Sequence, residues 1–161
     1  MTLIKKDAAD GSSPGMGYLF TGGKAMLIVY DSKTGNVKRF VGKLDVEHVQ
    51  IQEGLVVDQP FVLITYTTGF GQVPQSTLKF LEDNGELLQG VASSGNTNWG
   101  VRYGLAGDQV AEMYSVPLLM KFELSGTKKD VERFKQEVKQ IVYTYSNSNR
   151  HANANSQLDT A

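Results

Sequence analysis

Short apolar segments alternate with stretches of helical periodicity along the middle of the chain. Segments 26–30 and 61–66 are apolar over nearly their whole length, which is typical of strands covered on both faces. Shorter segments at 48–51, 87–92 and 117–122 have the length and composition of further strands. The pattern therefore predicts five strands.

Between these strands, apolar residues recur with the period of a helix. Residues 37–44 carry apolar side chains at i, i+3, i+4 and i+7, which share one helical face. Pro74 is predicted at the first position of the next helix, where proline is tolerated. Residues 106–113 are apolar on one side, and Thr127 with Asp130 forms a capping box before the last amphipathic helix.

Strands that alternate with helices predict an α/β fold, with a parallel sheet and helices on both of its faces. One connection is irregular, because residues 52–60 are too few for a helix that covers a sheet. We expect a loop or a single turn there.

Composition divides the chain of 161 residues into three zones. Residues 1–25 are rich in glycine and serine and have no sustained period. Residues 26–145 hold the alternating pattern and are the expected domain. Residues 146–161 are polar with almost nothing to bury, so they are predicted to be a disordered tail.

The first zone leaves two interpretations open. The Gly22-Gly23 pair is how a ribosome-binding GGA-GGU would be read in frame, at a usual distance before Met26. On this hypothesis translation naturally begins at Met26 and residues 1–25 come from a misassigned upstream start. On the other, they are a real flexible extension or a remnant of cloning. Codons such as GGC-GGC would remove the first interpretation.

Composition and charge exclude several kinds of chemistry. The chain has 16 Lys and Arg against 17 Asp and Glu, so it lacks the basic character of a nucleic-acid binder. It has no cysteine, which excludes disulfides and thiol chemistry, and His48 and His151 are too far apart in sequence for a His-rich metal site. No apolar run approaches the ~20 residues of a membrane span, and no signal-peptide core follows Lys5 and Lys6. We expect no metal, no membrane and a cytoplasmic location.

Candidate chemistry begins in the loop after the first strand. Ligands of open α/β sheets bind beyond the carboxyl ends of the strands, where the strand order reverses. Ser32, Thr34 and Gly35 precede the first amides of a helix, and together they form a candidate anion cradle. An ordinary capped helix after a glycine turn is the alternative. Neither the P-loop nor the dinucleotide glycine pattern is present, so nucleotide hydrolysis and dinucleotide binding are excluded.

The loops after the third and fourth strands offer glycines and aromatic rings. Phe70 stands between Gly69 and Gly71, and Trp99 is the only tryptophan of the chain. Ordinary turns, with Phe70 folded back on the core, are the alternative. The three loops together, with Tyr66 also available for stacking, suit a flat heterocycle that carries a phosphate. FMN fits better than a nucleotide, because no acid that could bind a ribose ends the second strand.

Four segments in this order resemble the NrdI family of flavodoxin-like proteins, which activate class Ib ribonucleotide reductase. The resemblance extends over residues 26–142 and depends on the motifs at 30–37, 64–71, 94–100 and 116–127. One departure is Thr97, where many members carry arginine, so this chain lacks the cation that those members have at that position.

The resemblance implies a five-stranded parallel sheet in the order 2-1-3-4-5 and a noncovalent FMN. It implies a redox accessory protein, in which the reduced flavin reacts with oxygen and supplies superoxide or peroxide. The partners implied are the dimanganese small subunit of the reductase, where a tyrosyl radical forms, and a donor that reduces the flavin. Gly69 and Gly71 are the candidates for tuning the flavin. The cofactor-binding residues implied are Ser32, Thr34, Gly35, Asn36, Val37, Thr67, Thr68, Gly69, Phe70, Gly71, Gly95, Asn96, Asn98, Trp99 and Gly100.

A general electron-transfer flavodoxin is the alternative function. Such carriers are usually strongly acidic, which attracts basic partners. Residues 26–146 hold 12 basic and 14 acidic residues, and this weak net charge of −2 favours a dedicated partner. A phospho-receiver domain is excluded, because Asp31 stands alone after the first strand and the third strand is followed by threonines.

Overall fold

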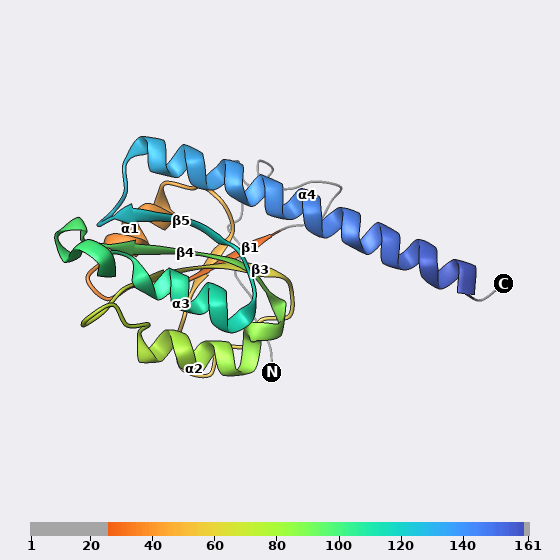
Figure 1. Ribbon diagram of the computed structural model, residues 1–161, viewed down its shortest axis with the longest axis horizontal. Helices are drawn as coiled ribbons and strands as arrows, with labels where there is room; N and C mark the ends of the chain where they lie inside the picture. The colour runs from red at the N-terminus through yellow and green to blue at the C-terminus, as the bar shows by residue number, and fades with distance from the viewer. Residues whose placement is uncertain (1–25, 160–161) are drawn as a thin grey trace.

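The computed structural model describes residues 26–159, so the predicted extension 1–25 lies outside the described residues. Five parallel strands form one sheet in the order β2-β1-β3-β4-β5 (Figure 1), which confirms the predicted fold class and order. The strands are β1 (Leu27–Tyr30), β2 (His48–Gln50), β3 (Phe61–Tyr66), β4 (Leu88–Gly95) and β5 (Leu118–Glu123).

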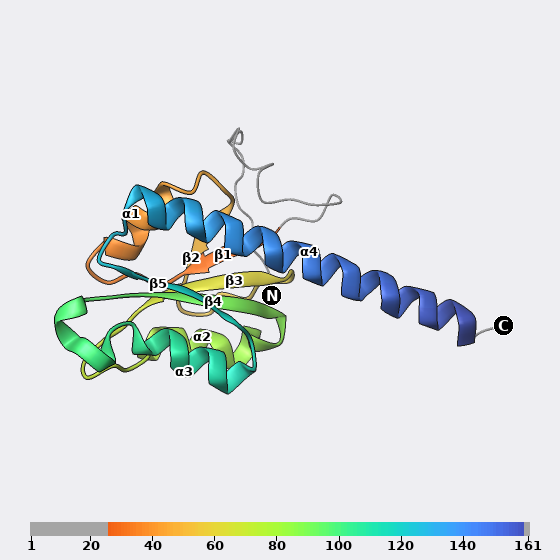
Figure 2. The same cartoon turned by 45° about the horizontal axis from the view of Figure 1, so that its top comes forward.

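Helices cover both faces of this sheet. In Figure 2, α1 and α4 lie on one side of the strands and α2 and α3 on the other. The helices are α1 (Asn36–Gly42), α2 (Gln75–Asn84), α3 (Leu105–Tyr114) and α4 (Lys128–Asp159), with short 3-10 helices η3 (Gly85–Leu87) and η4 (Thr97–Arg102).

Each face of the sheet has its own apolar core. Under α1 and α4, the ring of Phe40 stacks on Phe122 at 4.0 Å and meets the edge of Phe134 at 5.7 Å. Under α2, the rings of Phe61 and Phe80 pack edge to face at 5.5 Å. The predicted helical face of residues 37–44 is buried in the first of these cores, as its period requires.

The irregular connection between β2 and β3 has no helix, as predicted, and a buried asparagine holds it. The side chain of Asn84, at the end of α2, accepts a hydrogen bond from the Val57 amide at 2.9 Å. Its amide nitrogen donates to the Leu55 carbonyl at 3.1 Å. The single side-chain amide of Asn84 therefore satisfies a backbone N–H and a backbone C=O that regular secondary structure would otherwise pair.

Three details differ from the sequence-based expectations. Pro74 precedes α2 as its N-cap, with φ −61° and ψ 144°, instead of occupying the first helical position. β4 continues through Ser93 and Ser94 to Gly95, because both buried hydroxyls find carbonyl acceptors. Met113 is 52% exposed, since the buried side of α3 is formed by Ala106, Gly107 and Val110.

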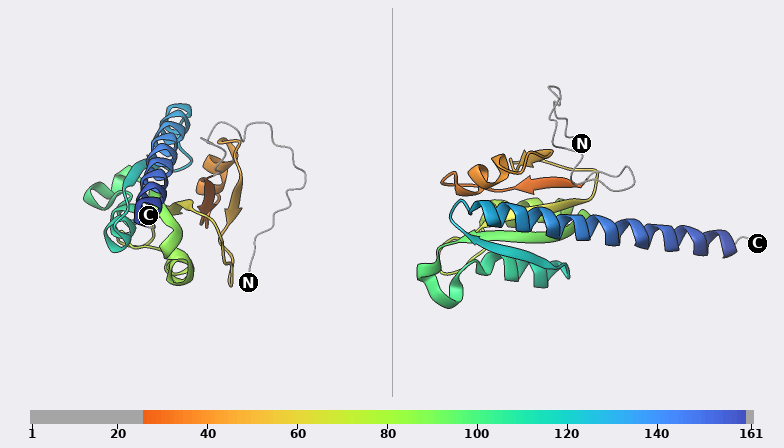
Figure 3. Two further views of the ribbon diagram at one scale, coloured as in Figure 1. Left: turned by 90° about the vertical axis from the view of Figure 1, so that its right-hand side faces the viewer. Right: turned by 90° about the horizontal axis from the view of Figure 1, so that it is seen from above.

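The last helix begins as predicted but extends further. The Thr127 amide donates to Asp130 at 2.8 Å and the Asp130 amide donates to the Thr127 hydroxyl at 3.1 Å, which confirms the capping box. The sequence predicts a disordered tail from residue 146, whereas α4 runs to Asp159 and projects past the sheet (Figure 3). Apolar residues up to Val142 dock the helix, and propagation from a formed helix carries no new nucleation cost.

Candidate functional site

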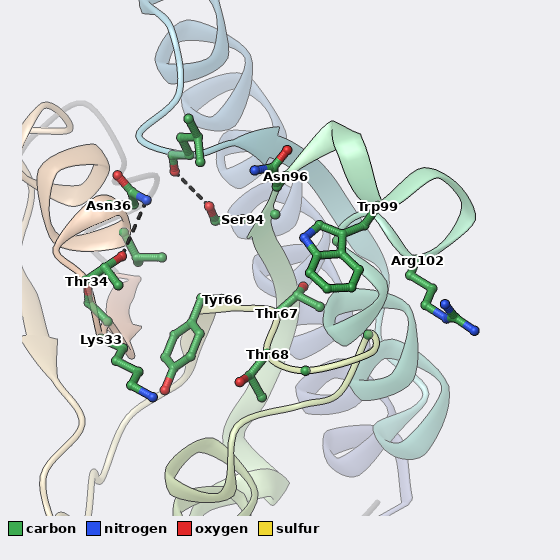
Figure 4. Close-up of a pocket in the computed structure, with 17 residues that line it drawn as sticks. Lys33, Thr34, Asn36, Tyr66, Thr67, Thr68, Ser94, Asn96, Trp99 and Arg102 are labelled. Carbon is green, nitrogen blue, oxygen red and sulfur yellow. Dashed lines mark hydrogen bonds between the residues drawn. The ribbon is translucent and has the colours of Figure 1, made fainter.

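A cavity of about 260 Å³ opens at the carboxyl ends of β1, β3 and β4 (Figure 4). It lies where the strand order reverses, between β1 and β3, which is the usual ligand position in an open α/β sheet. The three loops singled out from the sequence all contribute to its walls.

Eleven of the fifteen predicted cofactor-binding residues line this cavity: Ser32, Thr34, Asn36, Val37, Thr67, Thr68, Gly69, Gly71, Gly95, Asn96 and Trp99. The other four, Gly35, Phe70, Asn98 and Gly100, lie in the same loops but outside the lining. Among the residues that the predicted set omits, Lys33, Tyr66, Ser94, Arg102, Gly104 and Leu124 also line it. Three of these adjoin predicted residues, whereas Leu124 belongs to a fourth loop, after β5, which lies within the motif at 116–127 but for which the sequence predicts no contact with the cofactor.

The loop after β1 presents unpaired backbone donors. Within residues 26–159, the N–H groups of Thr34, Asn36 and Val37 donate to no protein oxygen. The Ser32 hydroxyl accepts from the Lys38 amide at 3.2 Å, which caps the first turn of α1. Free N–H groups beside hydroxyls at a helix start are the chemistry that binds a phosphate.

The loop after β3 is a tight turn closed by a short backbone ladder. The Thr68 amide donates to the Gln72 carbonyl at 2.9 Å, and the Gln72 amide donates back at 2.7 Å. Gly69 and Gly71 inside this turn have φ of 56° and 91°, which residues with a side chain rarely adopt. The turn therefore places bare backbone at the cavity wall.

The loop after β4 is fixed by side chains. Asn96 accepts from the Asn98 amide at 2.9 Å, and the Thr97 hydroxyl donates to the Glu123 carboxylate at 2.7 Å. A Cβ on Gly95 would lie 2.6 Å from the backbone nitrogen of Gly104, so this position requires glycine. Thr97 thus binds a carboxylate of its own chain.

Two exposed aromatic rings stand together at the rim. Phe70 is 70% exposed and Trp99 48% exposed, and their centroids are 6.1 Å apart at 81°. The guanidinium of Arg102 lies 5.6 Å from the Phe70 centroid, a cation–π distance. Contacts with Trp99 and Arg102 hold Phe70 at the mouth of the cavity, not against the core.

Tyr66 connects the cavity to a buried carboxylate behind it. Burial raises the pKa of the Tyr66 phenol, the negative charge of Asp31 raises it further, and a hydrogen bond with Ser76 lowers it. Asp31 itself is buried and accepts hydrogen bonds from the hydroxyls of Ser76 and Thr77. The phenol at the cavity wall is therefore neutral at physiological pH.

The charges around the cavity favour an anionic ligand. Lys33 and Arg102 are cationic, and the described residues that line the cavity include no carboxylate. Figure 4 shows Lys33 and Tyr66 pointing toward each other on one side of the cavity, with Trp99 on the other.

No helix of residues 26–159 is both long and apolar enough to cross a membrane.

Comparisons with known proteins agree with this geometry. Residues 28–136 match a family model described as NrdI flavodoxin-like. Protein NrdI of Bacillus licheniformis is 56% identical over 118 residues, covering 71% of this chain and 88% of that protein. The SPbeta prophage-derived protein NrdI of Bacillus subtilis is 52% identical over 118 residues, covering 71% and 92%. A solved flavodoxin of Streptococcus pneumonia TIGR4 shares the fold, with a TM-score of 0.57 and 25% identity over 74% of this chain and 98% of that one.

Proposed function

The chain belongs to the NrdI flavodoxin-like family, whose members bind FMN, and we propose that it is the redox accessory protein of a class Ib ribonucleotide reductase. In this proposal it works in the cytoplasm, takes electrons from a separate donor and serves the small subunit of the reductase. The donor and the subunit are partners implied by the family.

One observation carries the proposal. The unpaired amides of Thr34, Asn36 and Val37 lie at the switch point of the sheet, beside the hydroxyl of Ser32 and within a cavity lined by two cations. A phosphate with two negative charges satisfies these donors, and its charge strengthens each hydrogen bond. These residues fit the phosphate of FMN.

The rest of the cavity fits a flat ring. Tyr66 and Trp99 offer aromatic faces, and the turn around Gly69 and Gly71 offers backbone N–H and C=O groups without side chains in the way. This chain binds, orients and partly shields the cofactor. When bound and reduced, FMN supplies electrons to dioxygen, giving the superoxide or peroxide from which the dimanganese-tyrosyl radical cofactor is assembled.

The rim of the cavity supports a dedicated partner over a general carrier role. Phe70, Trp99 and Val101 are 70%, 48% and 92% exposed, which is unusual for large apolar residues. The net charge of residues 26–146 is only −2, so long-range steering is weak. Exposed apolar residues at the rim of a domain with little net charge suit docking by shape on one partner. A general electron-transfer flavodoxin is the alternative.

Anaerobic reduction of the FMN-loaded chain, followed by mixing with manganese-loaded small subunit and dioxygen, tests the proposal. We expect a yellow flavin spectrum before reduction and a tyrosyl-radical signal by electron paramagnetic resonance after mixing. A flavin spectrum without radical, combined with efficient reduction of artificial acceptors and no selective complex with the small subunit, supports the general flavodoxin. Absence of both spectrum and radical overturns both functions.

A further inference from the structure

Leu124 has a backbone conformation that its residue type disfavours. Its φ is 54°, in the left-handed region where the Cβ crowds the following carbonyl oxygen. Two other non-glycine residues of the described chain, Asp45 and Ser115, have a positive φ, and both have short polar side chains. Leucine has no polar group that could compensate locally, so something else must hold it.

Two hydrogen bonds to the end of β4 hold this backbone. The Leu124 amide donates to the Gly95 carbonyl at 3.0 Å. The buried hydroxyl of Ser94 donates to the Leu124 carbonyl at 2.7 Å, drawn as a dashed line from Ser94 in Figure 4. Both backbone polar groups of Leu124 are thus bound to residues that line the cavity.

The neighbours of Leu124 tie the same segment to the two flanking loops. Glu123, just before it, accepts from the Thr97 hydroxyl in the loop after β4. Ser125, just after it, donates its hydroxyl at 2.8 Å to Asn36, the first residue of α1, which follows the loop after β1. Leu124 therefore lies between the anion cradle after β1 and the loop after β4.

The protein itself leaves Leu124 about half uncovered. It lines the cavity and is 46% exposed, so much of its apolar surface faces the open space. A left-handed backbone favours glycine or asparagine at this position. Leucine is usually found where its side chain is fully buried, which is not the case here. A ligand that covers the side chain accounts for leucine at this position.

We propose that Leu124 is a cofactor-binding residue whose strained backbone holds an apolar contact against bound FMN. The inference rests on the proposed function, since it takes FMN as the ligand. Binding removes the exposed surface of Leu124 from water and so offsets the unfavourable conformation. The backbone cost is present in the free protein, and the gain appears only on binding.

The test measures FMN affinity and flavin-free stability separately. For Leu124→Gly we expect the FMN dissociation constant, from quenching of flavin fluorescence, to rise about tenfold, as loss of a half-buried leucine contact predicts. We expect its flavin-free unfolding midpoint to stay level or rise, because glycine relieves the left-handed strain. Leu124→Met keeps an apolar contact and should bind FMN nearly as the parent chain does. Ser115→Gly, at the C-terminal end of α3, relieves the same kind of strain and should leave FMN binding unchanged.

Each result decides for or against the role of Leu124. Parental FMN affinity in Leu124→Gly overturns it, and so does a parallel loss of affinity and flavin-free stability, which would mark a structural residue. If Leu124→Gly fails to fold, Leu124→Asn takes its place, because asparagine tolerates the conformation but lacks the apolar contact. An unsubstituted chain that does not bind FMN overturns the proposed function itself, and this inference with it.

Discussion

The carboxylate of Asp31 accepts a hydrogen bond of 2.7 Å from the hydroxyl of Thr77. Asp31 directly follows β1 and Thr77 lies in the first turn of α2, so the bond ties the end of a central strand to a helix 46 residues further along the chain. Both side chains are buried, with exposures of 6% and 0%. The start of a helix carries partial positive charge, which makes it a suitable neighbour for a buried carboxylate.

Thr77→Val should therefore destabilise the fold by about 1–3 kcal/mol, because it leaves a buried charge with one hydrogen bond fewer and keeps the volume of the side chain. Urea unfolding of the flavin-free protein measures the change. Thr144→Val, on the exposed side of α4, is the matched control and should change the free energy of unfolding little. Equal stability of the two variants would show that the Asp31 bond contributes nothing.

The raised pKa of Tyr66 predicts how the stability of the fold changes at alkaline pH. Its pKa lies above the ordinary 10.0, raised chiefly by burial and then by the charge of Asp31. The folded chain therefore holds this proton more tightly than the unfolded chain does. The resulting stability is present below pH 10 and is lost as the pH rises through the folded pKa.

Tyr66→Phe should accordingly show a smaller fall of the unfolding midpoint between about pH 9 and about pH 11. Tyr30 and Tyr103 also have raised pKa values and leave a residual dependence in both proteins. Tyr143→Phe, at an exposed position, should keep the parental profile. If the unfolding midpoints of Tyr66→Phe and of the parent chain depended on pH in the same way, the raised pKa of Tyr66 would contribute nothing to stability.

Local patterns made most of the fold predictable, whereas contacts between distant loops were not encoded in them. The period of residues 37–44 and the capping box at Thr127 are properties of a few neighbouring residues, and both are confirmed. Leu124 lines the cavity next to a contact between Ser125 and Asn36, which are 89 residues apart in the chain. The exposure of Met113 likewise depends on how α3 lies, which its own apolar residues do not define.

The end of β4 requires glycine at position 95, because the start of α3 passes too close for a side chain. A Cβ there would lie 2.6 Å from the Gly104 nitrogen, a backbone atom that cannot move without displacing the start of α3. Gly95→Ala should lower the free energy of unfolding by about 1–3 kcal/mol through overpacking. Gly42→Ala is the matched control, since its Cβ would meet nothing within 4 Å at the end of α1, and it should raise stability by up to about 1 kcal/mol. Thermal unfolding separates the two, and a Gly95→Ala variant as stable as the parent would refute the close contact.

Thr34→Ala tests the anion cradle through ligand selectivity. The Thr34 hydroxyl lines the cavity beside unpaired amides, where it would donate to a phosphate oxygen. Loss of one charge-assisted hydrogen bond should weaken FMN binding at least about tenfold. Riboflavin, which has no phosphate, should bind the variant and the parent chain equally. A similar loss for both ligands would place the effect of Thr34 elsewhere than on the phosphate.

Val101 separates partner docking from cofactor binding. It is 92% exposed in η4, next to the rim formed by Phe70 and Trp99, and it does not line the cavity. Val101→Asp should leave FMN affinity unchanged and weaken the complex with the reductase small subunit about tenfold or more, because docking would bury an unpaired carboxylate. Met113→Asp places the same charge on another exposed apolar residue, at the far end of α3, and should leave both affinities unchanged. Isothermal titration of each FMN-loaded variant with the small subunit measures the complex. Equal affinities for the two variants would mean that the partner docks on a surface other than this rim.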